Sequence, residues 1–360
     1  MKTPIIDGFS EAGLVSYLNT RQYSALYWPT LFPIKPVDRL DGKTMIGSVG
    51  SRIAAYVISY DTKAPETTRK SLTTQHFDIP KVAVARKKTE EEIIEHHITK
   101  AIRGNDAVLE DYFNDIDYVY DAVQARMEWM ALAALSATKF TLSTTNNPMG
   151  IVNETAVSFG MPTANQKVVT TATWTTGHAT TMVPITDFKK VVKAGRDAGV
   201  QLTKALMDAD TFDLITGSTE FQNAVKQFVN IETTVVGLES LALANKVMNS
   251  LRLPEIVIIN TSVGIENAAG TISYSNPWDT NHVTFIPDGA MGSMFAGPIA
   301  EEIEKPLNVL QSKRGPVLVS IQKEFNPVAV VTKGEANVFP SWPMVDKCFS
   351  LYHQDTGTWA

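Results

Sequence analysis

Residues 51–88 read SRIAAYVISYDTKAPETTRKSLTTQHFDIPKVAVARKK and carry eight basic and three acidic residues. The segments 51–60 and 75–86 are rich in β-branched and aromatic residues, which predicts two strands around a turn-rich tip. A limb of about 12 extended residues spans roughly 40 Å, whereas a compact chain of this length has a radius of gyration of about 21 Å. The limbs therefore either project from the molecule or divide among shorter strands. The alternative is an ordinary surface hairpin with solvated lysines.

A long acidic helix is predicted over residues 106–137, because apolar residues recur at steps of three and four from Leu109 to Met130. Between Asp106 and Glu128 this segment carries seven acidic residues and one basic residue. The acids have almost no basic partners one turn away within the helix. Their counter-charges must come from another segment, another subunit or ions, unless the acidic face is simply solvated.

The other predicted elements are helices and strands without a regular βαβ rhythm, so we predict an α+β fold. The aromatic, proline-broken stretch YSALYWPTLFPIKP (23–36) resists regular structure and is expected to need an external surface for packing. Residues 271–289 predict a hairpin that ends in a Pro-Asp-Gly turn, and Thr186 is the expected N-cap of a helix that stops at Gly199. Further helices are predicted over 89–102, 208–215 and 218–228, and further strands over 202–207, 253–260, 316–325 and 327–337.

Composition restricts the classes of function. The formal net charge of −6 argues against a protein that grips nucleic acid, because neutralising phosphates requires a dense basic surface. Charged residues make up 19% of the chain, below the roughly 25% usual for soluble domains, which fits a surface partly hidden in an assembly. Cys348 is the single cysteine, so no intrachain disulfide forms, and we expect it to pack in the interior. No apolar run approaches the ~20 residues that span a bilayer, and no membrane partner is expected.

Signatures of enzyme chemistry fail on inspection. Gly42-Lys43-Thr44 resembles the end of a phosphate-binding loop, but Val37 stands where that motif requires glycine. The glycines of residues 289–297 have the wrong spacing for a dinucleotide fingerprint. We therefore expect no enzyme activity, no catalytic residue, no cofactor and no metal.

Taken in order, these segments resemble the major capsid protein of tailed bacteriophages, specifically the lambda-like major capsid protein E family. The resemblance covers nearly the whole chain and includes the N-terminal arm, the basic hairpin and the acidic helix. It also rests on PITDFKKVVKAGRDAG (184–199) and ADTFDLITGSTEFQNAVK (209–226). Two C-terminal stretches carry most of it, FIPDGAMGSMFAGPIAEEI (285–303) and GPVLVSIQKEFNPVAVVTKGEANVFPSWPMVD (315–346).

The resemblance implies a tailed-phage capsid fold with four regions. They are an N-terminal arm (1–45), an extended β-hairpin loop (46–88), a peripheral domain (89–183 and 307–360) with a spine helix over about 106–137, and an axial domain (184–306). The loop is expected to lie over a neighbouring subunit, and the axial domains are expected to meet at five- and six-fold positions.

The implied function is that of a major capsid (head) protein in the virion. Copies self-assemble, in the host bacterial cytoplasm, into pentamers and hexamers of an icosahedral shell that encloses the phage genome, first as a procapsid and then, after maturation, as a capsid. The expected partners are other copies of the chain, a separate scaffolding protein because the chain begins almost directly with the arm, a portal and a decoration protein. Double-stranded DNA is enclosed without sequence-specific binding.

The charge pattern then suggests which residues join subunits, since a basic loop draped over an acidic helix of the next subunit sets register and partner choice. The competing hypotheses are the shell of a cellular encapsulated nanocompartment and an intracellular hydrolase with a dispersed active site. The interface candidates are Arg69, Lys70, Arg86, Lys87 and Lys88, facing Glu110, Asp111, Asp115, Asp117 and Asp121 of a neighbour.

Overall fold

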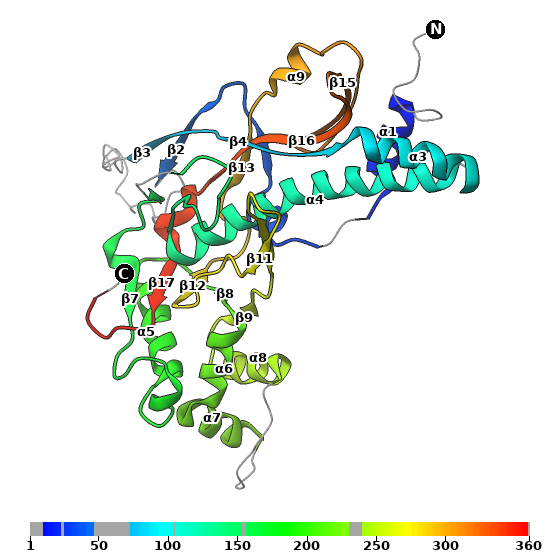
Figure 1. The fold of residues 1–360 in the computed structure, drawn as a ribbon. Helices are drawn as coiled ribbons and strands as arrows, with labels where there is room; N and C mark the ends of the chain where they lie inside the picture. The colour runs from blue at the N-terminus through cyan, green and yellow to red at the C-terminus, as the bar shows by residue number, and fades with distance from the viewer. Residues whose placement is uncertain are drawn as a thin grey trace, which may run out of the picture. The chain divides into compact units, whose positions relative to one another are not determined.

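The computed structural model describes residues 10–22, 25–46, 73–103, 105–152, 156–229 and 240–358. The chain divides into two compact units (Figure 1). Unit 1 contains the described parts of 1–42, 76–130 and 293–341, and unit 2 those of 43–75, 131–292 and 342–360. The predicted limb 51–60 lies outside the described residues.

Unit 1 is organised around a six-stranded sheet in the order β1-β13-β16-β15-β14, with β4 paired to the long strand β16. The sheet is antiparallel except where β1 runs parallel to β13. The predicted strands 316–325 and 327–337 are confirmed as the hairpin β15–β16. The strands are β1 (Ile34–Pro36), β4 (Lys81–Lys88), β13 (Ser293–Ala296), β14 (Val309–Arg314), β15 (Val317–Phe325) and β16 (Val328–Ser341).

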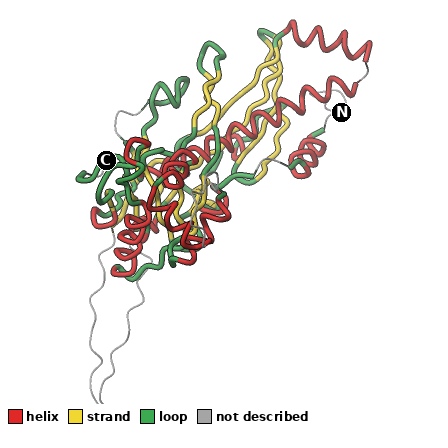
Figure 2. Tube along the Cα trace, turned by 90° about the horizontal axis from the view of Figure 1, so that it is seen from below, coloured by secondary structure: helices red, strands yellow, loops and turns green. Residues whose placement is uncertain are grey.

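The predicted long helix is confirmed as α4, with α3 before it in a helical hairpin (Figure 2). Ile116, Val119 and Val123 of α4 are buried, as the periodicity predicts. A Cβ at Gly334 of β16 would stand only 2.6 Å from the carbonyl oxygen of Val119, so the helix packs on the strand at a distance that only glycine allows. The helices of unit 1 are α1 (Glu11–Thr20), α2 (Trp28–Leu31), α3 (Glu90–Arg103), α4 (Asn105–Ala137, which continues into unit 2) and α9 (Ala300–Ile303).

Unit 2 surrounds a five-stranded sheet in the order β7-β17-β12-β8-β9. Its core gathers apolar side chains from this sheet and from the surrounding helices, with Trp174, Phe188 and Phe285 fully buried. Gly199, at φ +74°, follows the end of α5 as predicted. The helices are α5 (Pro184–Asp197), α6 (Ala209–Gly217), α7 (Thr219–Val229), α8 (Leu241–Ser250) and the short 3-10 turns Thr163–Asn165, Thr176–His178 and Pro343–Lys347. The strands are β5 (Lys139–Phe140), β6 (Val157–Ser158), β7 (Gln166–Val168), β8 (Lys204–Met207), β9 (Glu255–Ile258), β10 (Val263–Glu266), β11 (Ile272–Ser275), β12 (His282–Ile286) and β17 (Phe349–Tyr352).

Two predicted strand patterns are wrong. Residues 271–289 do not form a hairpin, because β11 pairs with β10 whereas β12 pairs with β17 and β8. Residues 75–86 are not one strand, since the chain breaks at residues 79–80 between β3 (Thr73–Asp78) and β4. The proline at that break cannot donate to a ladder, and β3 pairs with β2 (Asp41–Ile46) instead of continuing into the sheet of β4.

Two predictions about local packing are also wrong. Thr186 does not cap α5, which begins at Pro184; the Glu220 carboxylate accepts the backbone N–H groups of Ile185 and Thr186 at 2.8 and 3.2 Å. In the stretch 23–36, Trp28 and Phe32 are buried within unit 1 and need no external surface, and the segment forms α2 and β1 instead of resisting regular structure. The prolines of its described part remain exposed.

Candidate subunit interface

The end of the basic limb meets the acidic helix within one subunit. In β4, Arg86 Nη1 lies 3.3 Å from Asp115 Oδ1, and Lys88 Nζ lies 3.4 Å from Asp115 Oδ2. The register of β4 on β16 fixes this geometry, since Arg86 stands opposite Thr332 and Lys88 opposite Val330. The strand thus presents alternate residues, Arg86 and Lys88, to the same helix.

Aromatic rings extend this contact. The Arg86 guanidinium lies 3.6 Å from the centre of the Tyr118 ring, and the Lys88 ammonium lies 4.1 Å from that of Tyr112. Both are cation–π distances. Because Lys88 and Asp115 are largely buried, we expect their pairing to matter more to stability than an exposed pair would.

The N-terminal segment supplies further counter-charge to α4. Arg21 Nε lies 3.2 Å from Asp117 Oδ2, and the hydroxyl of Tyr17 donates to the same carboxylate at 2.7 Å. Burial and this bond raise the pKa of Tyr17 to about 12. Burial and the neighbouring Asp117 raise the pKa of Asp121. Asp115 and Asp117 of α4 therefore have basic partners from other segments of the same chain.

Glu128 has a role that the sequence did not reveal, because by charge it is only one of the seven acids of the helix segment. Its buried carboxylate accepts the backbone N–H groups of Tyr27 and Trp28 at 2.9 and 2.8 Å, and the Trp28 indole N–H donates to Gln124 Oε1 at 3.1 Å. These bonds fix the start of α2 on α4. The only available signal is the position of Glu128 on the apolar side of the helix, five residues after Val123 and next to Met127.

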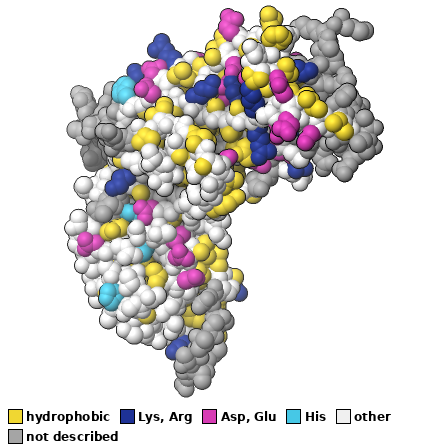
Figure 3. Space-filling model, viewed as in Figure 1, with side chains coloured by type: hydrophobic (Ala, Val, Ile, Leu, Met, Phe, Trp, Pro, Cys, Tyr) yellow, Lys and Arg dark blue, Asp and Glu magenta, His cyan; other side chains and the backbone are white. Residues whose placement is uncertain are grey.

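A second charged cluster lies on the sheet. Lys81 Nζ lies 2.5 Å from the buried carboxylate of Glu335, which also lies 3.1 Å from Lys333 Nζ. Lys333 forms a further ion pair with Glu301. Burial acts to lower the pKa of Lys333, but its bonds to Glu301 and Glu335 outweigh this and leave the pKa raised. On the face shown in Figure 3, basic and acidic side chains are interspersed in this way.

The structure describes the side chains of only some of the ten predicted interface residues. Arg69 and Lys70 lie outside the described residues, as do the side chains of Glu110 and Asp111 on α4. Lys87 is half exposed and pairs with Glu324 of β15 at 2.7 Å. The pairs seen here lie within one subunit, and pairing across subunits stays a prediction.

Exposed apolar side chains mark other parts of the surface. Phe325, at the tip of the β15–β16 hairpin, is 92% exposed, and Leu307 is 88% exposed. On α3, Ile94 and Ile98 lie one turn apart and are both exposed. Cys348 is buried as predicted, and burial raises the pKa of its thiol. Among the described helices, none is long and apolar enough to cross a lipid bilayer.

Residues 49–351 match the family model described as phage major capsid protein E. A phage-related protein from Bordetella bronchiseptica RB50 is 13% identical, with a TM-score of 0.53 over 98% of this chain and 99% of that one. A candidate capsid protein of a prophage of Escherichia coli CFT073 is 14% identical, with a TM-score of 0.56 over 96% and 99% of the two chains. The search of curated proteins gives no significant match.

Proposed function

The chain belongs to the phage major capsid protein E family, and we propose that its copies close an icosahedral shell of pentamers and hexamers around a double-stranded DNA genome. Its role as the major shell protein of a phage capsid follows from the family. The main support for this role is the length of the match to the family model, which covers residues 49–351 and includes parts of both units. The same extent disfavours a hydrolase with a dispersed site, and we assign the chain a structural, non-enzymatic role.

We also propose the division into arm (1–45), loop (46–88), peripheral domain (89–183 and 307–360) and axial domain (184–306). In support, β4 and α4 lie against each other in unit 1. The axial range supplies β8, β9 and β12 to the sheet of unit 2, which β7 and β17 of the peripheral range complete.

Charge pairing between subunits is proposed for the candidates that keep exposed surface. Lys87 remains half exposed despite its pair with Glu324, and Arg86 remains half exposed beside Asp115. Asp121 is also exposed. Asp117, and Arg69, Lys70, Glu110 and Asp111, whose side chains lie outside the described residues, are proposed on their charge alone. Exposed pairs of this kind set register and association rate more than affinity.

The remaining partners are proposals from the family resemblance: a separate scaffolding protein, a portal, a decoration protein, and assembly in the host bacterial cytoplasm. The net charge of −6 supports DNA that is enclosed without being gripped. Expression of the chain with and without its scaffold, followed by sedimentation and negative-stain imaging, tests the function. Shells that carry a defined protein cargo instead of DNA would favour the encapsulated nanocompartment.

A further inference from the structure

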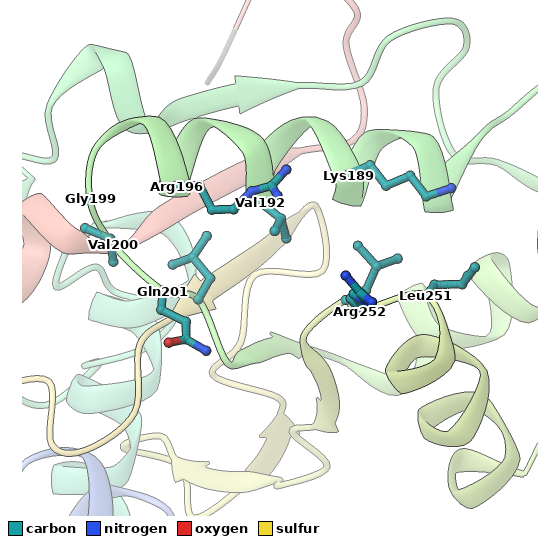
Figure 4. Close-up of a pocket in the computed structure, with 10 residues that line it drawn as sticks. Lys189, Val192, Arg196, Gly199, Val200, Gln201, Leu251 and Arg252 are labelled. Atoms are coloured by element: carbon teal, nitrogen blue, oxygen red, sulfur yellow. The ribbon is translucent and has the colours of Figure 1, made fainter.

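A cationic hollow of about 670 Å³ opens in unit 2 between α5 and the turn that follows α8 (Figure 4). Lys189, Val192 and Arg196 lie on one stripe of α5, at the spacing of successive turns. Arg252 comes from the turn before β9, so two segments about 60 residues apart supply the cations. Val200 and Leu251 contribute apolar surface.

The charges of this hollow are not balanced locally. Among the described residues that line it, three are basic and none is acidic. Lys189, Arg196 and Arg252 have no ion pair with any described residue. Arg196 lies in the last turn of α5, where a cation also stabilises the helix carbonyls. That role leaves guanidinium donors free, so the hollow suits an occupant that combines a carboxylate with apolar side chains.

A segment of this composition is exposed in the same unit. The strands β10 and β11 form a two-stranded sheet with no third strand among the described residues. Their register places Glu266 opposite Ile272 and Gly264 opposite Tyr274, so these four residues share one face. On that face Glu266, Ile272 and Tyr274 are all exposed, whereas Val263 and Ile265 of the other face are buried.

Gly264 shapes this face. A Cβ there would stand 3.0 Å from the Tyr274 ring and 3.1 Å from the Ile272 side chain, so both side chains lie over the glycine. The result is a small apolar surface with a carboxylate at its edge. The buried face holds the ribbon on its own subunit, so the exposed apolar face is the one that a partner would cover.

A ring of identical subunits needs two different surfaces on each copy, because each subunit presents one side to the next and receives the opposite side from the previous one. We propose that the cationic hollow of one copy receives the β10–β11 hairpin of the adjacent copy. The Glu266 carboxylate then meets the guanidinium groups of Arg196 and Arg252, and Ile272 and Tyr274 cover Val200 and Leu251. This inference rests on the proposed function, since it concerns neighbours in a capsid ring.

Engineered disulfides test the contact directly, because Cys348 is the only cysteine of the chain and is buried. Gln201→Cys places a thiol in the hollow, and Tyr274→Cys places one on the hairpin. After oxidation of assembled particles, a mixture of the two single variants should give covalent dimers, and the double variant should give a ladder of higher multimers. Either single variant alone should stay monomeric on a non-reducing gel. Absence of dimers from assembled mixtures would overturn the proposal.

Charge variants provide an independent test. Arg196→Glu with Arg252→Glu should lower the yield of rings and shells roughly tenfold or more, because like charges would face each other across the contact. Lys193→Glu, on α5 but outside the hollow, is the matched control and should assemble as the native chain does. Adding Glu266→Arg to the double variant should restore part of the yield.

The outcomes separate this inference from the proposed function. If the native chain forms no rings or shells, the function itself fails. If native and reversed chains assemble alike, the function stands and the hairpin contact is wrong. If the reversed chains assemble normally but retain less DNA, the hollow binds nucleic acid instead, which also overturns the proposal.

Discussion

The carboxylate of Glu128 and the backbone N–H of Trp28 lie 2.8 Å apart, joining residues 100 positions apart in the sequence. The same carboxylate accepts the N–H of Tyr27, and both groups would otherwise lie at the uncapped start of α2. This acid on the long helix therefore holds the N-terminal segment within the subunit.

Replacing Glu128 with alanine removes the acceptor of both N–H groups. We expect a loss of roughly 2–5 kcal/mol in the free energy of unfolding, because the buried N–H of Trp28 and the partly buried N–H of Tyr27 lose their acceptor. Denaturant unfolding of the unassembled subunit measures the loss. Glu95→Ala, at an exposed position of α3, is the control and should be near neutral. Equal stabilities of the two variants would contradict the anchoring role.

The stabilising role of Glu128 depends on pH. Burial raises its pKa above the ordinary 4.5, although the two backbone bonds offset part of the increase. A folded-state pKa raised in this way gives a contribution to stability that is fully present below about 4.5 and is lost as the pH rises through the folded value. The stability of the native chain relative to Glu128→Gln should therefore fall as the pH rises above about 4.5. A difference that is constant or rises with pH would show that the carboxylate is not desolvated.

Gly334 sets how closely the sheet approaches α4. Gly334→Ala places a Cβ 2.6 Å from the Val119 carbonyl oxygen, so we expect roughly 1–3 kcal/mol of destabilisation from overpacking. Gly217→Ala is the matched control, because its Cβ meets nothing within 4 Å and its φ is not positive. Thermal unfolding of both variants checks the prediction, which fails if they unfold at the same temperature.

Charge reversals at Lys87 and Lys88 distinguish an effect on shell assembly from an effect on the stability of the subunit. Lys88→Glu puts a carboxylate against the largely buried Asp115 and should destabilise the subunit by roughly 2–5 kcal/mol. Lys87→Glu changes an exposed pair and should cost less than about 1 kcal/mol. If Lys87 pairs across subunits, its reversal nonetheless impairs shell assembly, which sedimentation of the folded protein detects.

Lys323→Glu is the control for this pair of variants, since Lys323 lies exposed on β15, which is separated from β4 by β16. Particles of Lys87→Glu that form in normal yield would exclude Lys87 from the interface.

Much of the fold follows from local patterns. The steps of three and four along α4 correctly predicted that helix, because it buries a defined face. The strands β15 and β16 were also predicted correctly. The hairpin expected over 271–289 failed because strand pairing is a long-range property. His282–Ile286 is buried on every residue and binds strands distant in sequence, whereas Ile272–Ser275 stays exposed beside β10.

The contacts of the candidate interface could be predicted from the sequence only in part. Charge counts correctly drew attention to the basic limb and the acidic helix, but they gave no indication that Asp115 is buried between Arg86 and Lys88. Nor did they reveal that Glu128 serves as an acceptor for backbone groups about 100 residues away. Such partners are set by tertiary packing, which a helical charge pattern does not encode.

Sedimentation velocity with negative-stain imaging of the purified chain, alone and with the proposed scaffolding protein, tests the central claim most directly. The account predicts rings of five and six subunits or closed shells in at least one of the two conditions. A compact monomer that persists in both would contradict the assignment as a shell-forming capsid subunit.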